Sequence, residues 1–274
     1  MLKLQHKSIY REPLVLVGTL LIGLTIFMAL VSFALPSPNE MNLEKRFLNP
    51  SWQHPFGLDQ NGSDVFAQVF YGARVSLFVA FSVVLITHIV GLLIGSLAGY
   101  WGRWWDQTLM RFIDMIQAFP SFLLALALVA VLGPSIKNLI FAMCLTGWAG
   151  VARLVRGEVL HLKELDYVAA SRATGASHFR TIMFYIWPNL VGPLLVNASF
   201  ALAATIIAES GLSFLGLGAP ANVPTWGSLL NSGRKVLIEA PHVSVFPGLA
   251  ILFLILGFNL LGDGLRDHLD PRKS

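Results

Sequence analysis

Long apolar segments constrain this chain more than any other feature of its sequence. A transmembrane helix needs about 20 consecutive and mostly apolar residues, and the run from Leu14 to Leu35 contains no charged residue. We therefore expect an all-α membrane protein whose helices cross the bilayer six times. The six predicted spans are 13–35, 75–100, 107–132, 138–154, 190–207 and 243–261.

The N-terminal segment has features of a secretory signal peptide, because Lys3, Lys7 and Arg11 precede an apolar run. The apolar region of a cleavable signal is about 7 to 15 residues long. The run after Arg11 is longer than that, which favours an uncleaved first span.

Composition agrees with a membrane protein. Only 12% of the 274 residues are charged, whereas soluble domains carry about 25%. The net charge of +4 does not indicate a nucleic-acid binder, since the basic residues are scattered and form no single face. Cys144 is the only cysteine, which excludes an intramolecular disulfide and a cysteine-based metal site.

Lysine and arginine divide unequally between the two sides of the predicted spans, with 13 on the side that holds both termini and 6 on the other. Cytoplasmic loops carry the excess of positive charge in membrane proteins. We therefore expect a cytoplasmic N-terminus (1–12), a six-span domain (13–264) with a cytoplasmic loop at 157–188, and a cytoplasmic tail (265–274).

Two predicted spans contain residues that shape helix packing. Gly91, Gly95 and Gly99 are four residues apart, so they share one helix face and favour close contact with another helix; the alternative is the general abundance of glycine in membrane helices. Pro120 predicts a kink in the third span. Arg111 and Asp114 are spaced to form an ion pair, with a proton-carrying role for Asp114 as the alternative.

The segment between the fourth and fifth spans has a helix–glycine–helix pattern. We expect one helix over 158–173, with Leu162, Leu165, Ala169 and Ala173 on an apolar stripe. Gly175 then suits the left-handed position after a helix, and Ser177 suits the cap of a second helix. That helix presents an apolar face, and Pro188 either ends it or opens the fifth span; the face consists of Phe179, Ile182, Met183 and Ile186. A hairpin lying on the membrane surface is the alternative.

This segment resembles the EAA loop of ABC importer permeases, in which Glu-Ala-Ala precedes a glycine and, further on, a proline. Gly175, Pro188 and Ala170 match, whereas Ala169 and Ser171 stand where the family has Glu and Ala. The family's Glu helps to bind the ATPase subunit, so the resemblance implies that other contacts replace it. The implied ATPase-coupling residues are Asp166, Ala169, Ala170, Ser171, Arg172, Gly175, Ala176 and Ser177.

Motifs along nearly the whole chain resemble the dipeptide/oligopeptide/nickel branch of these permeases. The matching segments are H-P-F-G-L-D-Q-N-G-S-D-V (54–65), Y-G-A-R-V-S-L (71–77), D-M-I-Q-A-F-P-S (114–121), A-R-L-V-R-G-E-V-L (152–160), E-S-G-L-S-F-L-G-L-G (209–218), P-T-W-G (224–227) and N-L-L-G-D-G-L-R-D (259–267). Ser63 replaces an Arg that is usual in the family.

The resemblance implies the type I permease fold in a bacterial inner membrane. It also implies three kinds of partner: a second, related permease, one or two ATPase subunits, and an extracytoplasmic solute-binding protein. ATP and magnesium would bind to the ATPases, and no cofactor to this chain. The implied cargo is a short peptide, with nickel or another small solute as the alternative.

The residues themselves provide no source of energy. No Gly-Lys pair occurs, so the chain lacks a phosphate-binding P-loop, and acidic residues are too scarce in the spans for a proton or sodium relay. Candidate pathway or packing residues are His88, Pro120, Asn197 and Glu209. An ATP-independent channel is the alternative from another class, and a membrane-embedded enzyme lacks the clustered polar residues that it would need.

Overall fold

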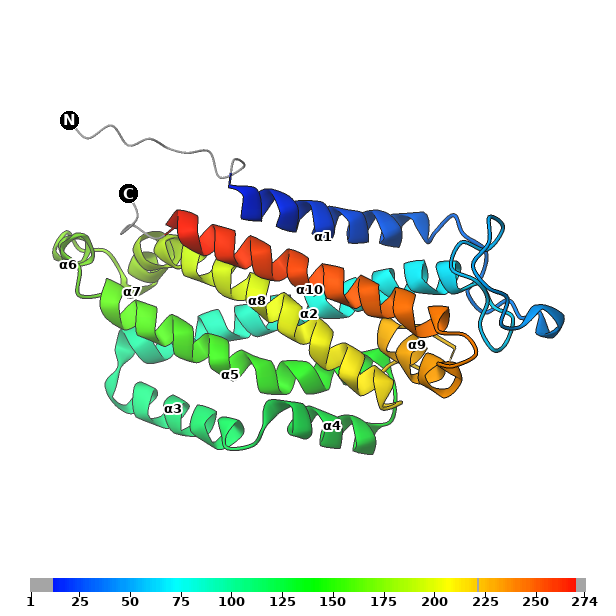
Figure 1. The fold of residues 1–274 in the computed structure, drawn as a ribbon. Coiled ribbons are helices and arrows are strands. Elements are labelled where there is room, and N and C mark those ends of the chain that lie inside the picture. Colours follow the sequence, from blue (N-terminus) through cyan, green and yellow to red (C-terminus); the bar gives the residue numbers. More distant parts are fainter. Residues whose placement is uncertain (1–11, 221, 270–274) are drawn as a thin grey trace.

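The computed structural model of the protein describes residues 12–220 and 222–269. In this part the regular structure is helical, with one isolated β-bridge between Leu58 and Asp64. The long helices lie side by side along one direction, with α6 at one end of the bundle and α9 at the other (Figure 1). The helices are α1 (Pro13–Val31), α2 (Val65–Trp101), α3 (Arg103–Gln117), α4 (Ser121–Leu132), α5 (Ile136–Leu162), α6 (Asp166–Ala173), α7 (His178–Thr181), α8 (Trp187–Phe214), α9 (Trp226–Gly233) and α10 (His242–Leu269).

Five helical segments in the described part are long and apolar enough to cross a membrane: α1, α2, α5, α10 and the segment His178–Phe214. The last of these joins α7 to α8 through a π-helical turn at Ile182–Ile186. Taken together, α3 and α4 are also long and apolar enough to cross a membrane, although the two helices meet at a bend of 74°. Counted as one broken span, this pair gives the six spans that the sequence predicts.

Several helices continue beyond the apolar runs that define the predicted spans. The outer loop predicted to reach Arg74 ends at Asp64, whose carboxylate accepts a hydrogen bond from the Phe66 amide at 2.8 Å and caps α2. Arg74 therefore lies within α2, and its guanidinium lies 4.0 Å from the centre of the Phe33 ring. This cation–π contact accommodates the charge of Arg74. The fourth span likewise continues through Gly147 and Gly150 to Leu162.

The third predicted span is broken at Pro120 rather than kinked. Proline disfavours helical geometry in the residue before it, and Pro120 itself is extended, with φ −57° and ψ 120°, as the residue that precedes α4. The predicted pair of Arg111 with Asp114 is also wrong. Asp114 accepts a hydrogen bond from Arg153 of α5 at 2.6 Å, and Asp106 pairs with Arg156, so two ion pairs attach α3 to α5.

The three glycines of α2 form a close contact with a neighbouring helix. A β-carbon on Gly91 would lie 2.6 Å from the Val151 β-carbon, and one on Gly95 would lie 2.5 Å from the Ala152 carbonyl oxygen. On Gly99 it would lie 2.9 Å from the Val159 β-carbon. The predicted packing face is therefore confirmed, and α5 is the helix that occupies it. We call this contact the α2–α5 seam.

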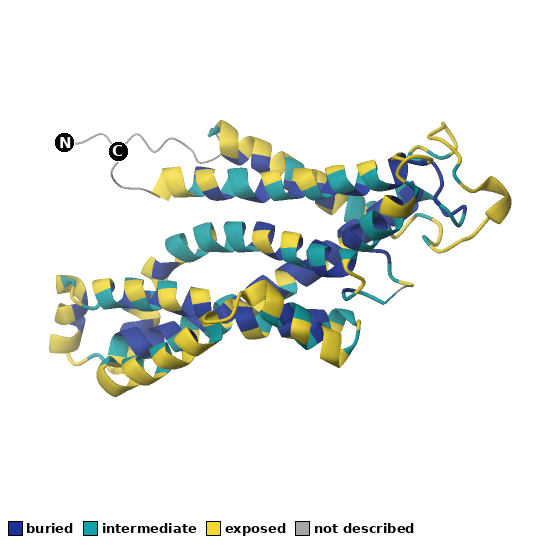
Figure 2. Ribbon diagram, turned by 60° about the horizontal axis from the view of Figure 1, so that its bottom comes forward, coloured by how far each residue is buried: buried dark blue, intermediate teal, exposed yellow. Residues whose placement is uncertain are grey.

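Burial distinguishes the central helices from the peripheral ones. In an apolar 18-residue stretch of α5, 50% is buried inside the protein, against 28% in the corresponding stretch of α1. The α1 helix lies along α10, where Gly18 approaches the Gly257 carbonyl oxygen. Figure 2 shows exposed residues along the outward sides of the helices and in the loops, as expected for surfaces that meet lipid or partner subunits.

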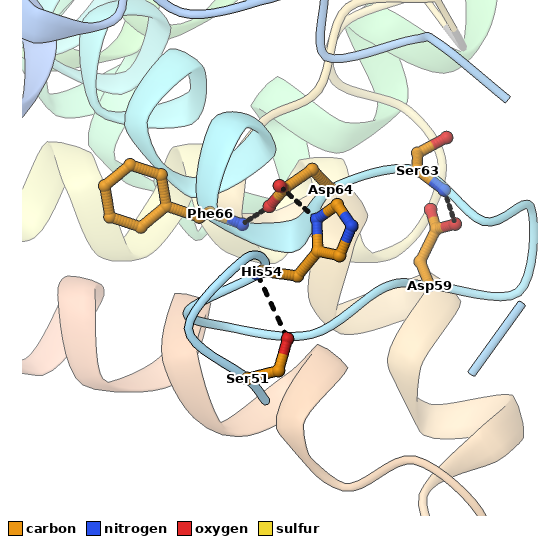
Figure 3. A network of polar contacts seen from close by, with 6 residues as sticks. All are labelled: Ser51, His54, Asp59, Ser63, Asp64 and Phe66. Atoms are coloured by element: carbon orange, nitrogen blue, oxygen red, sulfur yellow. Dashed lines mark hydrogen bonds and ion pairs between the residues drawn. The ribbon is translucent and has the colours of Figure 1, made fainter. Parts of the chain in front are cut away.

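The end of the bundle opposite α6 is built from the loop 32–64, α9 and the segments 215–220 and 222–225. The loop folds on itself through polar contacts: His54 Nδ1 lies 2.9 Å from Asp64 Oδ2, and Asp59 Oδ1 accepts from the Ser63 amide at 2.9 Å (Figure 3). Trp226 at the start of α9 is fully buried, and its Nε1 donates to the Val69 carbonyl oxygen at 2.9 Å. We call this end the outer end, after the orientation predicted from the sequence.

The α2–α5 seam predicts a steric effect on stability. Gly95→Ala places a methyl group against a backbone oxygen that cannot rotate away, and we expect the unfolding free energy to fall by about 1–3 kcal/mol, as for other overpacked sites. Thermal unfolding of the purified protein in detergent measures this.

Gly23→Ala is the matched control, because among the described residues the added carbon would meet no atom within 4 Å outside its own helix backbone. We expect its unfolding temperature to equal or slightly exceed that of the wild type, since alanine favours helix more than glycine does. An unchanged unfolding temperature in Gly95→Ala would show that the seam is not tightly packed.

Candidate coupling and translocation sites

The predicted glycine elbow is present at the end of α6. Gly175 has φ +87°, its amide donates to the Arg172 carbonyl oxygen at 3.0 Å, and the Ala176 amide donates to the Ser171 carbonyl oxygen at 3.0 Å. These two bonds form a Schellman motif, in which a left-handed glycine closes the last helical turn. Ser177 then caps α7 by accepting from the Arg180 amide at 3.3 Å, as predicted.

Most of the predicted coupling residues lie on the exposed surface of this elbow. Asp166, Ala169, Ala170, Arg172, Gly175 and Ser177 are exposed, Ala176 is half-buried and Ser171 is buried. Added atoms on Gly175 would meet nothing within 4 Å. We call the surface formed by these exposed residues the coupling surface. Its side chains are either small or polar.

Two details of this segment differ from the prediction. The helix expected over 158–173 is split, because α5 ends at Leu162 and a turn precedes α6. Since the turn interrupts the helical periodicity, the residues of the predicted apolar stripe do not share one face. The buried residues of α6 are Val168 and Ser171, while Ala169 is exposed. The second helix continues into α8, where Pro188 lies in the first turn, so Pro188 opens the fifth span, one of the two predicted alternatives. Of the predicted apolar face, Ile182 and Ile186 are buried while Phe179 and Met183 are exposed.

The elbow stands on a buried cluster contributed by α5 and the start of the fifth span. Val155, Val159, Ile182 and Ile186 belong to this cluster, and each is at most 7% exposed. Hydrophobic contacts of this kind make neighbouring helices move together because protein interiors are close-packed.

Polar contacts attach the elbow to the ends of the long helices. Lys163 donates through Nζ to the Gly99 carbonyl oxygen at 2.9 Å, and Arg172 donates to the Lys163 carbonyl oxygen at 2.8 Å. The Tyr167 hydroxyl contacts the Tyr185 carbonyl oxygen at 3.3 Å. These contacts attach α6 to the ends of α2 and α5 and to the start of the fifth span.

His88 and Asn197 lie together, on α2 and α8. His88 Nδ1 lies 2.9 Å from the Val84 carbonyl oxygen, its Nε2 is buried without a hydrogen-bond partner, and the Asn197 side chain is within interaction range of the ring. No group of three or more potential metal ligands occurs among the described residues. The pair is a polar contact between two spans.

Glu209 is fully buried between α2, α8 and α9. Its carboxylate accepts from the hydroxyls of Ser76 at 3.0 Å and Ser213 at 2.8 Å, with Ser210 at 3.4 Å. The partners are hydroxyl groups of α2 and α8. Buried carboxylates need such partners because burial without them is costly, so Glu209 joins α2 to α8 at the outer end.

Pro120 lines a hollow on the outside of the bundle, where the break between α3 and α4 faces Gly147 and Gly150. A separate cavity of about 220 Å³ lies between α2, α4, α5 and α8. Its threonines, Thr87, Thr146 and Thr205, bond to carbonyl oxygens of their own helices. The cavity is therefore largely apolar and unsuited to a charged solute.

Sequence reasoning missed the groups that surround the candidate residues. Ser213 lies one helical turn after Glu209, a spacing that places both on one face and was visible in the sequence. Ser76 and Lys163 gave no such signal, because their partners, Glu209 and Gly99, are far away in the chain.

Comparison with known proteins agrees with this architecture. Residues 91–274 match the family described as the inner membrane component of binding-protein-dependent transport systems. The dipeptide transport system permease protein DppC of Alkalihalophilus pseudofirmus is 41% identical over 270 residues, which cover 98% of this chain and 89% of that protein.

Two other relatives are similarly close. A putative peptide transport system permease protein of Brucella suis is 44% identical over 235 residues, covering 86% of this chain and 79% of that protein. The glutathione transport system permease protein GsiD of Escherichia coli is 44% identical over 223 residues, covering 81% and 74%. The matched family is a transport component and not a family of enzymes. This chain belongs to the binding-protein-dependent transport system inner membrane components, the multi-pass permease subunits of ABC importers.

Proposed function

We propose that this protein forms one half of the translocation pathway of an ATP-driven importer of short peptides. Its relatives are permeases named for dipeptide, peptide and glutathione transport. In such an importer the second half is a related permease, one or two ATPase subunits bind and hydrolyse ATP with magnesium, and an extracytoplasmic binding protein delivers the cargo.

The coupling surface is proposed to face the cytoplasm. The unequal distribution of lysine and arginine supports this orientation, although Lys3, Lys7, Arg11, Arg272 and Lys273, which contribute to it, lie outside the described residues. The start of α1 and the end of α10 lie at the same end of the bundle as α6 (Figure 1), as an even number of spans requires.

One observation carries the coupling role: an exposed helical elbow stands on a buried cluster shared by the spans. Its surface is open for an ATPase subunit, and its base is fixed to α2, α5 and α8. Asp166 lies one turn before Ala169, on the same face of α6, and is exposed. We assign to Asp166 the contact that Glu makes in the family, while Arg172 bonds back to Lys163.

The mechanism follows from this arrangement. ATP draws the two ATPase subunits together, the elbow follows as a rigid body, and the spans alternate between inward-open and outward-open states. A change of state requires a difference in contact energy between the two states. ATP binding and docking of the binding protein provide that difference.

Gly175→Val tests the coupling role. Valine is strained at φ +87°, so the elbow changes shape while the ATPase sites stay intact. We expect uptake to fall by roughly 5- to 150-fold, the range of typical coupling free energies, with ATP hydrolysis retained. Reconstituted importer in liposomes gives both rates.

Gly133→Val is the matched control, since Gly133 has φ +86° and open space around it but lies at the outer end. Uptake should persist in this variant. Equal losses in both variants, or normal uptake in Gly175→Val, would remove the elbow from the coupling mechanism.

The cargo assignment predicts the outcome of a direct comparison of solutes. A strain that lacks its own peptide importers and expresses the whole system should accumulate labelled dipeptide, and an inactive ATPase subunit should abolish the uptake. Nickel accumulation should stay at the level of the empty strain. Nickel uptake without dipeptide uptake would refute the peptide assignment, and dipeptide uptake without an ATPase would indicate a channel.

A further inference from the structure

The outer end contains a polar hollow that the coupling mechanism does not use. It measures about 360 Å³ and is lined by the loop 32–64, the first turn of α2, the end of α8 with its following loop, and α9. Sites for small molecules typically measure about 300–1,000 Å³, so the hollow has room for a group about the size of a dipeptide. We call it the outer hollow.

Two amide oxygens of the outer hollow lack hydrogen-bond donors. Gln68 Oε1 and Asn231 Oδ1 are buried and unpartnered, and both side chains line the hollow. Gln68 is only 7% exposed. Buried polar atoms are nearly always paired with protein or an ordered molecule, so these two acceptors need a donor that the described part of the chain does not provide.

The orientation of the Gln68 amide is fixed by its neighbours. Its Nε2 donates to Asp59 Oδ2 at 2.9 Å, and Asp59 Oδ1 accepts from the amides of Asn61 and Ser63 (Figure 3 shows the Ser63 contact). A carboxylate accepts only, so Nε2 must face it and Oε1 must face away. The Gln68 oxygen is therefore presented as an acceptor.

Two hydroxyls and the one charge of the lining agree with this acceptor character. The hydroxyls of Ser213 and Ser228 already donate to Glu209 and to the Thr225 carbonyl oxygen. Among the described residues that line the hollow none is Lys, Arg or His, and Asp59 is the one acidic residue. The hollow thus favours a ligand that donates hydrogen bonds and carries positive charge, and an ammonium group has both properties.

We propose that the outer hollow binds the α-ammonium group of a short peptide at the entrance to the pathway. The inference rests on the proposed function, because peptide cargo is what brings an ammonium group to the outer end. A lysine side chain of a partner protein has the same chemistry, so the experiment must exclude the binding protein.

The test uses the purified complex of both permeases and the ATPases, without binding protein, and a dipeptide that carries a photoreactive diazirine side chain. We expect labelled peptides from the outer hollow, identified by mass spectrometry. Excess dipeptide with a free amino group should prevent labelling, and the same dipeptide with an acetylated amino group should not.

Substitutions at Asn231 separate the role of the acceptor from folding. Asn231→Leu should weaken binding by roughly 10- to 150-fold, the factor for a hydrogen bond to a charged group. Asn231→Asp should tighten it, since a carboxylate attracts an ammonium group more strongly. Asn49→Leu is the control, because Asn49 is exposed in the same outer loop and does not line the hollow.

Equal competition by free and acetylated dipeptides would overturn the proposal, as would unchanged labelling in Asn231→Leu. Absence of labelling until binding protein is added would also overturn it and assign the hollow to a partner's side chain. Dipeptide uptake by the same complex with binding protein tests the proposed function separately: uptake without labelling refutes only this inference.

Discussion

The close approach of α2 and α5 is the contact on which the rest of this structure depends. In a bilayer, apolar side chains gain little by leaving lipid, so helices associate where small residues allow their backbones to meet. Gly91, Gly95 and Gly99 provide that approach over two helical turns. The contact continues to the ends of both helices, where Lys163 donates to the Gly99 carbonyl oxygen just before α6.

This continuity gives the two ends of the bundle different properties. At the coupling end, a short exposed helix is fixed to three long helices through one buried cluster and a few polar contacts. At the outer end, Glu209 and its hydroxyl partners join α2 and α8, and Trp226 fixes α9 to α2. Long helices that are fixed at both ends can carry a displacement from one face of the membrane to the other.

The sequence was sufficient for features that depend on local chemistry. Four-residue glycine spacing predicted the seam, and Gly175 and Ser177 predicted the elbow, because a left-handed turn and a helix cap depend on single residues. The sequence was insufficient for features that depend on contacts between distant parts of the chain. Val65 begins α2 because Asp64 caps it, Asp114 pairs with Arg153 rather than Arg111, and Glu209 meets Ser76 across the bundle. The break at Pro120 exceeded the predicted kink because Ala118 to Pro120 leave the helix altogether.

The central claim is that the coupling surface contacts the ATPase and moves with the spans. A photo-crosslinking amino acid at Ala169, in the assembled importer, tests it most directly. The account predicts a crosslink to an ATPase subunit whose yield changes when ATP is bound, and no such product from the same amino acid at Gly133. Crosslinks from position 169 to lipid alone, or to the extracytoplasmic binding protein, would contradict the account.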